Sequence, residues 1–244
     1  MISYIAKMKT IVIVAALVCI SFAQASKILI SAPSGSKSSK NAYVPLTKEL
    51  VKRGHDVTVI CNYPTADFKN LKLVHEIVLP QLQPDLSAFP NQFQFALGNV
   101  SVLDRLSLIQ NFLSNSTLPE KTALVTFGDP RIQNLLESSH FDLVYTHLGD
   151  RYVSLPLAWH FQAPLIGFSP NVLPPGIATI LGDSEHTEYV PLISSMYSDE
   201  MNLMQRAINT ASVTYLQYAD AAARSGVEEI VIKKVSTYNE VIMS

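Results

Sequence analysis

The chain has little charge and few cysteines. Its 244 residues include 18 basic and 20 acidic side chains, a formal net charge of −2, and only 2 cysteines. Two cysteines cannot make a disulfide-stapled scaffold, and nucleic-acid binders usually carry excess positive charge. With 48% hydrophobic residues, the composition also excludes a disordered or low-complexity chain. The length suits one large domain or two small ones with a substantial core.

The sequence also lacks the short motifs of several enzyme classes. It contains neither a GxxxxGK[ST] loop nor a GxGxxG loop, so two common phosphate-binding turns are missing. HExxH, CxxC and GxSxG are absent too, which argues against a zinc protease, a zinc ribbon and a serine hydrolase. The histidines have no partner at metal-ligand spacing, and we expect no metal site.

The N-terminus is typical of a secretory signal peptide. Lys7 and Lys9 precede the 13 uncharged residues from Thr10 to Phe22, and a small-x-small pattern ends at Ala25. The alternative is a signal anchor, but 13 helical residues span only about 20 Å, less than the ~30 Å core of a bilayer. We therefore expect residues 1–25 to be removed. No second apolar run is long enough to predict a membrane span in the mature chain.

Two features of residues 26–244 agree with the secretory pathway. N-glycosylation sequons occur at Asn99 and Asn115. Cys19 leaves with the leader, so Cys61 remains alone, and a lone cysteine in a predicted strand is usually a small core residue. We expect a glycoprotein of the endoplasmic reticulum lumen or a secreted protein, without an intrachain disulfide.

Hydrophobic patterning predicts a doubly wound, Rossmann-like α/β sheet. Short apolar runs predict strands at residues 27–32, 56–61, 73–79, 141–147 and 164–168. Apolar residues at helical spacing predict helices at residues 42–52, 102–113, 131–137, 153–161 and 199–223. Pro45 fits the first turn of its helix, Gly54 fits a C-cap, and residues 169–193 fit a proline-rich loop. The first two strands and their helix form a βαβ unit, so these strands should be parallel.

Ligands of such sheets bind beyond the carboxyl ends of the strands, so two loops matter. Residues 33–41 contain Gly35 and several serines, which either hold an anion or cap the following helix. Residues 147–151 contain His147 and Asp150. His147 is either a base that works near neutral pH or a polar residue at a strand end.

Several blocks of this chain resemble animal UDP-glycosyltransferases, the UDP-glucuronosyltransferase family. They are residues 27–33, 43–46, 52–60, 141–144 and 161–166, and the pattern YVP…SD-x-M…QR between residues 189 and 206. The resemblance implies a GT-B fold, in which two Rossmann-like domains face each other across a cleft. Residues 26–244 would be the N-terminal, acceptor-binding half, without the donor domain. The implied reaction transfers a glycosyl group from a UDP-sugar, a co-substrate, to a small lipophilic acceptor, with no cofactor.

The resemblance also implies site residues. In the family a loop histidine takes the proton of the acceptor, and an aspartate orients that histidine. The spacing from Pro45 places the histidine at Ser39, and the spacing from Phe141 places the aspartate at His147. Serine is no base at neutral pH, so one hypothesis makes His147 the base and Asp150 its orienting group.

The acceptor wall is expected in the apolar insertion, where the alternative is ordinary core. Its candidate residues are Phe89, Phe93, Phe95 and Leu97.

Two functions from different classes therefore remain open. The chain is the acceptor-binding half of a transferase, inactive alone, or it is a secreted, non-catalytic protein that binds small lipophilic molecules. A third reading makes it a partner that modulates full-length family members.

Overall fold

The computed structural model describes residues 25–83, 117–169, 173, 176–192, 195 and 197–234. Several predictions fall outside these residues and stay predictions. They are the leader at residues 1–24, the helix at residues 102–113, the acceptor wall (Phe89, Phe93, Phe95 and Leu97) and the sequons at Asn99 and Asn115.

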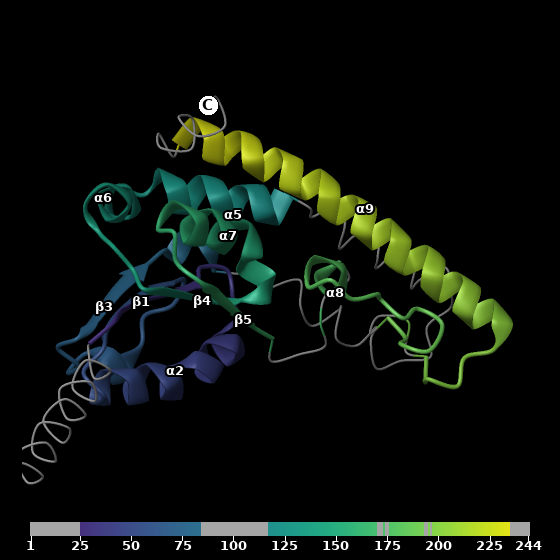
Figure 1. Cartoon of the computed structure of the whole chain (residues 1–244), viewed down its shortest axis with the longest axis horizontal. Helices are drawn as coiled ribbons and strands as arrows, with labels where there is room; N and C mark the ends of the chain where they lie inside the picture. Colours follow the sequence, from purple (N-terminus) through teal and green to yellow (C-terminus); the bar gives the residue numbers. More distant parts are fainter. Residues whose placement is uncertain are drawn as a thin grey trace, which may run out of the picture.

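Five parallel strands form one sheet (Figure 1). They are β1 (Lys27–Ala32), β2 (Asp56–Cys61), β3 (Val74–Val78), β4 (Leu143–His147) and β5 (Leu165–Phe168). Their order is β3-β2-β1-β4-β5, and every neighbouring pair is parallel. The chain adds β2 and then β3 on one side of β1, crosses to the other side of β1, and adds β4 and then β5, as in Rossmann-like folds. The predicted doubly wound α/β sheet is confirmed.

Helices cover both faces of the sheet (Figure 1). α2 (Lys37–Lys52) lies on one face, and α5 (Thr117–Gly128), α6 (Pro130–Ser138) and α7 (Arg151–His160) lie on the other. The long helix α9 (Leu203–Lys234) runs across α5 and α7, and the short α8 (Ile177–Ile180) lies beside it. Three 3₁₀ turns complete the described elements: η1 (Ala66–Phe68), η2 (Pro80–Leu82) and η4 (Leu148–Asp150).

The core has two parts, one on each face of the sheet. Ile28 and Ile30 of β1 pack with Tyr43 of α2. Leu29, between them in sequence, packs on the opposite side with Phe127 of α5 and residues of α7 and α9. This alternation follows from the two-residue period of a strand, which points successive side chains to opposite faces.

Helix α2 begins earlier than the sequence predicts. Ser36 is its N-cap, and its side chain accepts a hydrogen bond from the Ser39 amide at 3.2 Å. The cap starts the helix at Lys37, so Pro45 lies inside the helix and its expected place in the first turn is wrong. Proline has no N–H, so the helix forgoes one internal hydrogen bond there.

The end of α2 agrees with the prediction. Gly54 has φ +89°, the left-handed conformation that favours glycine. Its N–H donates to the Val51 carbonyl at 2.9 Å, and the His55 N–H donates to the Leu50 carbonyl at 3.1 Å. These two bonds are the Schellman pair that satisfies carbonyls at a helix end.

Other boundaries differ. β4 begins at Leu143 rather than at residue 141, and the expected loop at residues 169–193 contains α8. α9 runs to Lys234, beyond the predicted end at residue 223, because it continues through Gly226. A Cβ at Gly226 would meet the carboxyl group of Glu120 on α5, so the two helices lie close together at this glycine. α5 was not predicted from the sequence.

Candidate functional site

The carboxyl ends of β1 and β4 lie side by side because the two strands are direct neighbours. The loop after β1 and the turn after β4 therefore meet. Asp150, buried in that turn, holds them together: its Oδ1 accepts a hydrogen bond from the Ser34 amide at 3.0 Å and another, short one from the Ser34 hydroxyl. We call these two hydrogen bonds the Ser34–Asp150 clamp.

A buried hydroxyl network lies directly beneath the clamp. Thr146 donates to the Ser31 carbonyl at 2.9 Å, and its hydroxyl is 2.5 Å from that of Ser154. Ser154 in turn donates to the Ser31 hydroxyl at 2.9 Å, and all three side chains are buried. The network joins β1, β4 and α7, so it fixes the strand ends that carry the loops.

His147 is the last residue of β4 and is largely buried, with 19% of its side chain exposed. Its Nδ1 accepts a hydrogen bond from the Gly149 amide at 3.2 Å. The ring also packs edge-on against Phe168, with ring centroids 5.6 Å apart. A Cβ at Gly149 would lie 2.8 Å from the imidazole Cε1, so the ring needs glycine at this position.

The carboxylate of Asp150 faces His147 but is not hydrogen-bonded to it. Oδ2 lies 3.7 Å from the imidazole Nδ1, is buried, and has no hydrogen-bond partner among the described residues. Because Nδ1 accepts from Gly149, the neutral ring carries its proton on Nε2. A base acting through Nε2 requires the other tautomer, with the proton on Nδ1 and Asp150 Oδ2 as its acceptor.

Ser39 lies in the first turn of α2 and takes part in its cap. Its hydroxyl is 3.0 Å from that of Ser36, which also lies 2.8 Å from the Ser38 hydroxyl. Among the described residues, the Ser39 hydroxyl contacts neither a histidine nor a carboxylate. Nothing next to it can therefore take its proton.

A second polar cluster lies at the carboxyl end of β2. Glu76 of β3 accepts from the Thr65 amide at 3.1 Å and from the Thr65 hydroxyl at 2.5 Å, and it forms an ion pair with Lys40 at 3.5 Å. Lys40 also donates to the Tyr63 carbonyl. Burial and the nearby Glu76 raise the pKa of Cys61 to about 12. Cys61 is thus the inert core thiol that the sequence predicts.

The structure brings two of the predicted site residues together, since His147 and Asp150 lie 3.7 Å apart. Ser39 lies in the first turn of α2, and its side chain contacts the Ser36 cap rather than either of these residues. Ser34 was missed as a partner of Asp150. The two residues are 116 positions apart, and their contact depends on β1 and β4 being neighbours.

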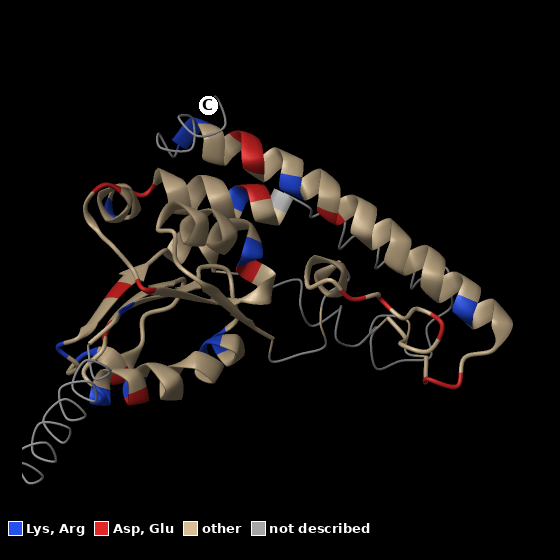
Figure 2. Ribbon diagram, viewed as in Figure 1, with Lys and Arg blue, Asp and Glu red and all other residues tan. Residues whose placement is uncertain are grey.

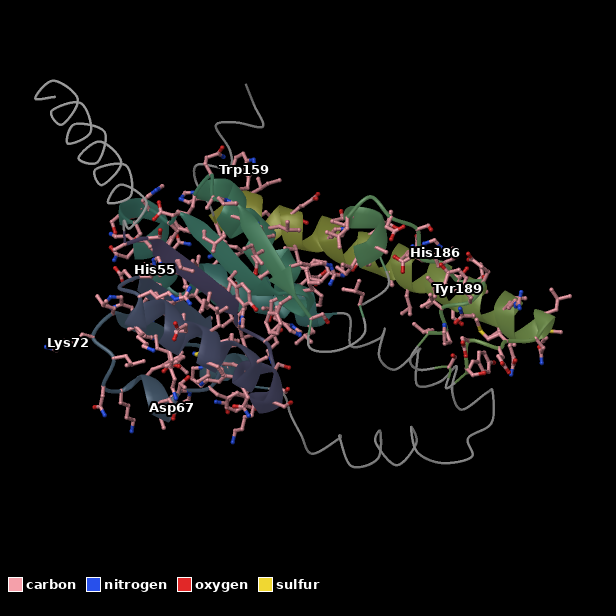
Figure 3. All side chains as sticks on the ribbon, turned by 60° about the horizontal axis from the view of Figure 1, so that its bottom comes forward. His55, Asp67, Lys72, Trp159, His186 and Tyr189 are labelled. Atoms are coloured by element: carbon pink, nitrogen blue, oxygen red, sulfur yellow. The ribbon has the colours of Figure 1, made fainter. Side chains whose placement is uncertain are left out.

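Two negative findings apply to the part of the chain that the structure describes. There, no group of three His, Cys, Asp or Glu side chains is placed to hold a metal ion. Figure 3 labels His55 near the sheet and His186 beside α9, on separate parts of the chain. No helix within the same described residues is both long and apolar enough to cross a bilayer.

Comparison with known proteins identifies the family. A family model described as "UDP-glucoronosyl and UDP-glucosyl transferase" matches residues 26–241. The chain belongs to the UDP-glycosyltransferase family. This family uses a UDP-sugar donor and no metal cofactor, and it acts on acceptor substrates.

Relatives in the family are much longer than this chain. UDP-glucosyltransferase 2 of Dactylopius coccus is 29% identical over 201 residues, which cover 82% of this chain and 37% of the relative. UDP-glucuronosyltransferase 2B10 of Homo sapiens is 25% identical, over 71% of this chain and 34% of the relative. The chain thus spans about a third of the length of these relatives.

Proposed function

We propose that this chain is the acceptor-binding half of a UDP-glycosyltransferase and places a small lipophilic alcohol or phenol beside His147. The observation that carries the proposal is the Ser34–Asp150 clamp at 3.0 Å, which joins two loops at the carboxyl edge of a Rossmann-like sheet. Ligands of such sheets bind at this edge. Membership of the family supplies the reaction, transfer of a glycosyl group from a UDP-sugar.

In this proposal His147 takes the proton of the acceptor hydroxyl through Nε2. For this, the ring first loses its Nε2 proton to solvent and gains one on Nδ1. Nδ1 then leaves the Gly149 amide and donates a hydrogen bond to Asp150 Oδ2, which is 3.7 Å away and has no hydrogen-bond partner among the described residues. The freed acceptor oxygen attacks the anomeric carbon, and the bond to UDP breaks. Ser39 contributes a hydroxyl that can hydrogen-bond the acceptor.

The remaining parts of the proposal rest on the sequence. Phe89, Phe93, Phe95 and Leu97 form the wall against which the acceptor packs. The leader directs the chain to the secretory pathway, where it stays in the endoplasmic reticulum lumen or is secreted. Asn99 and Asn115 carry glycans there, and full-length family members are candidate partners.

A second candidate function is non-catalytic binding of the same lipophilic molecules. Two observations favour it. Ser39 stands where the family has its histidine and contacts only serine hydroxyls among the described residues. The Nδ1 atom of His147 accepts a hydrogen bond from Gly149, which is the wrong tautomer for a base at Nε2.

A binding experiment tests the acceptor site. We expect the chain to bind 1-naphthol more tightly than 1-methoxynaphthalene, by about fivefold, because only the phenol can donate a hydrogen bond to His147. His147→Ala should abolish this preference. His140→Ala is the matched control, since His140 is exposed and precedes the amino end of the same strand. Equal affinity for the two compounds, unaffected by His147→Ala, would refute the proposed site.

A chimera separates the two candidate functions. Residues 26–241 would replace the corresponding segment of UDP-glucosyltransferase 2, whose remaining sequence is kept. A transferase half predicts that the chimera makes naphthyl glucoside from UDP-glucose, and that His147→Ala lowers the rate at least about a hundredfold. Naphthol binding without any product would favour the non-catalytic binder. Turnover by the chain alone would contradict the expectation that it is inactive alone.

A further inference from the structure

A groove of about 330 Å³ lies between α7 and α9, and none of Ser34, Ser39, His147 and Asp150 lines it. Its apolar lining comes from three helices: Leu155 and Trp159 of α7, Ile180 of α8, and Val227 and Val231 of α9. Leu155, Trp159 and Ile180 are 41%, 37% and 44% exposed, unusually high values for large apolar side chains that gather at one place. The volume is at the lower end of the ~300–1,000 Å³ typical of small-molecule sites.

The groove extends from an ionic cluster into an apolar channel. Arg151 and Asp220 form an ion pair where α7 and α9 meet. Trp159 lies two turns further along α7, about 12 Å away at 1.5 Å per residue. Val231 lies about 16 Å further along α9 by the same rise. The groove is therefore elongated, with the two arginines toward one end and Trp159, labelled in Figure 3, toward the other.

The ionic cluster carries more positive than negative charge. Arg151 and Arg224 share one carboxylate, that of Asp220, and Arg224 lies 3.5 Å from it. Burial, with a contribution from Arg224, holds the pKa of Arg151 below its usual value. Figure 2 shows that basic and acidic residues alternate along α9, which lies above α5 and α7 in this view.

The guanidinium group of Arg224 retains hydrogen-bonding capacity. It lines the groove, is 46% exposed and, among the described residues, pairs with Asp220 alone. The Nε of Arg151 has no hydrogen-bond partner within the described part of the chain, but it is buried, so Arg151 contributes its charge rather than a contact through Nε. A carboxylate placed there would gain charge-assisted hydrogen bonds from a planar donor that matches its geometry.

Glu228 also lines the groove, one turn beyond Arg224. It is exposed and, within the described part of the chain, forms no ion pair with Arg224. A single anionic head fits better than a multiply charged one, because the head must sit near Asp220 and Glu228 as well as near the two arginines.

We propose that the groove between α7 and α9 binds a single-chain amphiphile with a carboxylate head, such as a fatty acid. The carboxylate pairs with Arg224 beside Arg151, and the hydrocarbon chain lies along Leu155 and Val227 toward Trp159. The site is distinct from the proposed acceptor site, because it uses none of Ser39, His147 and Asp150.

Fluorescence offers a direct test, because Trp159 is the single tryptophan of the 244-residue chain. Decanoate, decanol and decyltrimethylammonium are titrated into the purified chain below their micelle concentrations. We expect decanoate to change the Trp159 emission in a saturable way, with an affinity at least about tenfold higher than decanol or the cationic compound. If decanol binds as tightly as decanoate, the proposed role of the arginines is wrong.

Three variants sharpen the test. Arg224→Gln should weaken decanoate binding about tenfold and leave decanol binding unchanged. Arg53→Gln, an exposed arginine at the end of α2, is the matched control and should change neither. Leu155→Glu places a second anion beside the hydrocarbon chain and should abolish decanoate binding. Circular dichroism and thermal unfolding of each variant check that the fold persists.

Two outcomes would overturn the proposal. Equal weakening of decanoate and decanol by Arg224→Gln would mean that the variant distorts the groove rather than removing a head-group contact. A dimeric chain that Leu155→Glu converts to a monomer, with no response to decanoate, would mean that a second copy covers the groove. His147→Ala should leave decanoate binding intact, so failure here and failure of the acceptor site are distinguishable.

Discussion

The Ser34–Asp150 clamp predicts a measurable coupling energy between two residues that are 116 positions apart. Ser34→Ala removes the hydroxyl hydrogen bond and leaves the backbone one. Hydrogen bonds to charged groups contribute about 1.5–3 kcal/mol. The Asp150 side chain has 0% exposure, so solvent does not screen this contact. In a double-mutant cycle of Ser34→Ala and Asp150→Ala, we expect a coupling free energy of about 1.5–3 kcal/mol.

The assay is urea unfolding at 25 °C, followed by the fluorescence of Trp159 and by far-ultraviolet circular dichroism. For a domain of about 150–250 residues, 1 kcal/mol corresponds to about 2–4 °C in Tm. In thermal unfolding, Ser34→Ala should therefore lower Tm by about 3–12 °C. Asp150→Ala removes both hydrogen bonds of the clamp together with the buried carboxyl group, so its own effect on stability includes more than the coupling.

Ser36→Ala provides the control. Ser36 lies on the same loop, but its hydroxyl caps α2 and contacts Ser38 and Ser39 rather than Asp150. Its loss should cost about 1 kcal/mol, the usual value of an N-cap, and should be additive with Asp150→Ala to within about 0.5 kcal/mol. A Ser34–Asp150 coupling no larger than that of the control pair would refute the clamp.

Three further predictions follow from the geometry. Gly149→Ala should displace the His147 ring, because the new Cβ would lie 2.8 Å from the imidazole Cε1. The variant should then lose the preference for 1-naphthol, as His147→Ala does, and an unchanged preference would contradict the contact between Gly149 and the ring. Gly54→Ala should lower the free energy of unfolding by about 1–2 kcal/mol through backbone strain alone, since nothing lies within 4 Å of its Cβ; a neutral result in urea unfolding excludes the left-handed turn. Burial raises the pKa of Cys61 to about 12, so this thiol should not react with Ellman's reagent at pH 8 until urea unfolds the chain. Peptide mass spectrometry distinguishes Cys61 from Cys19, and rapid labelling of Cys61 in the native chain would be inconsistent with a buried thiol.

The sheet could be predicted from the sequence because each strand is a short, apolar, β-branched run with clear ends. β1 and β2 have the predicted bounds, since charged or polar residues and Gly54 delimit them on both sides. The parallel pairing followed from the βαβ connection, and the order of the strands agrees with the predicted doubly wound class.

The helices were harder, for a physical reason in each case. Pro45 suggested a helix start, but the Ser36 cap outweighs the one hydrogen bond that proline removes. The helix predicted at residues 199–223 ends eleven residues too early, because α9 continues through Gly226 along α5 to Lys234. α5 escaped detection because its buried face mixes Ala123 and Phe127 with the polar Thr122 and Thr126, so it shows no continuous apolar stripe.

Some features of the candidate site could also be predicted from the sequence, and others could not. That the loop after β1 and the turn after β4 lie at the same edge of the sheet was predictable from topology, and the two do meet, through Ser34 and Asp150. The hydrogen bond between Asp150 and Ser34 could not be predicted, because hydrogen bonds between distant loops leave no periodic pattern in the sequence. The tautomer of His147 also depends on a local contact, the Gly149 amide at 3.2 Å, that only the folded turn creates.

The clamp and the hydroxyl network hold the strand ends and loops of the candidate site in place. Ser31, Thr146 and Ser154 fix the strand ends from below, and Ser34 and Asp150 join the loops above. Ser39 and His147, the two positions expected from the sequence to depart from the family pattern, contribute no side chain to these hydrogen bonds. In the proposed mechanism only Asp150 has both roles, since it holds the loops together and also orients His147. Such a site can keep its binding geometry whether His147 acts as a base or only as a hydrogen-bonding contact, which is why binding and turnover must be measured separately.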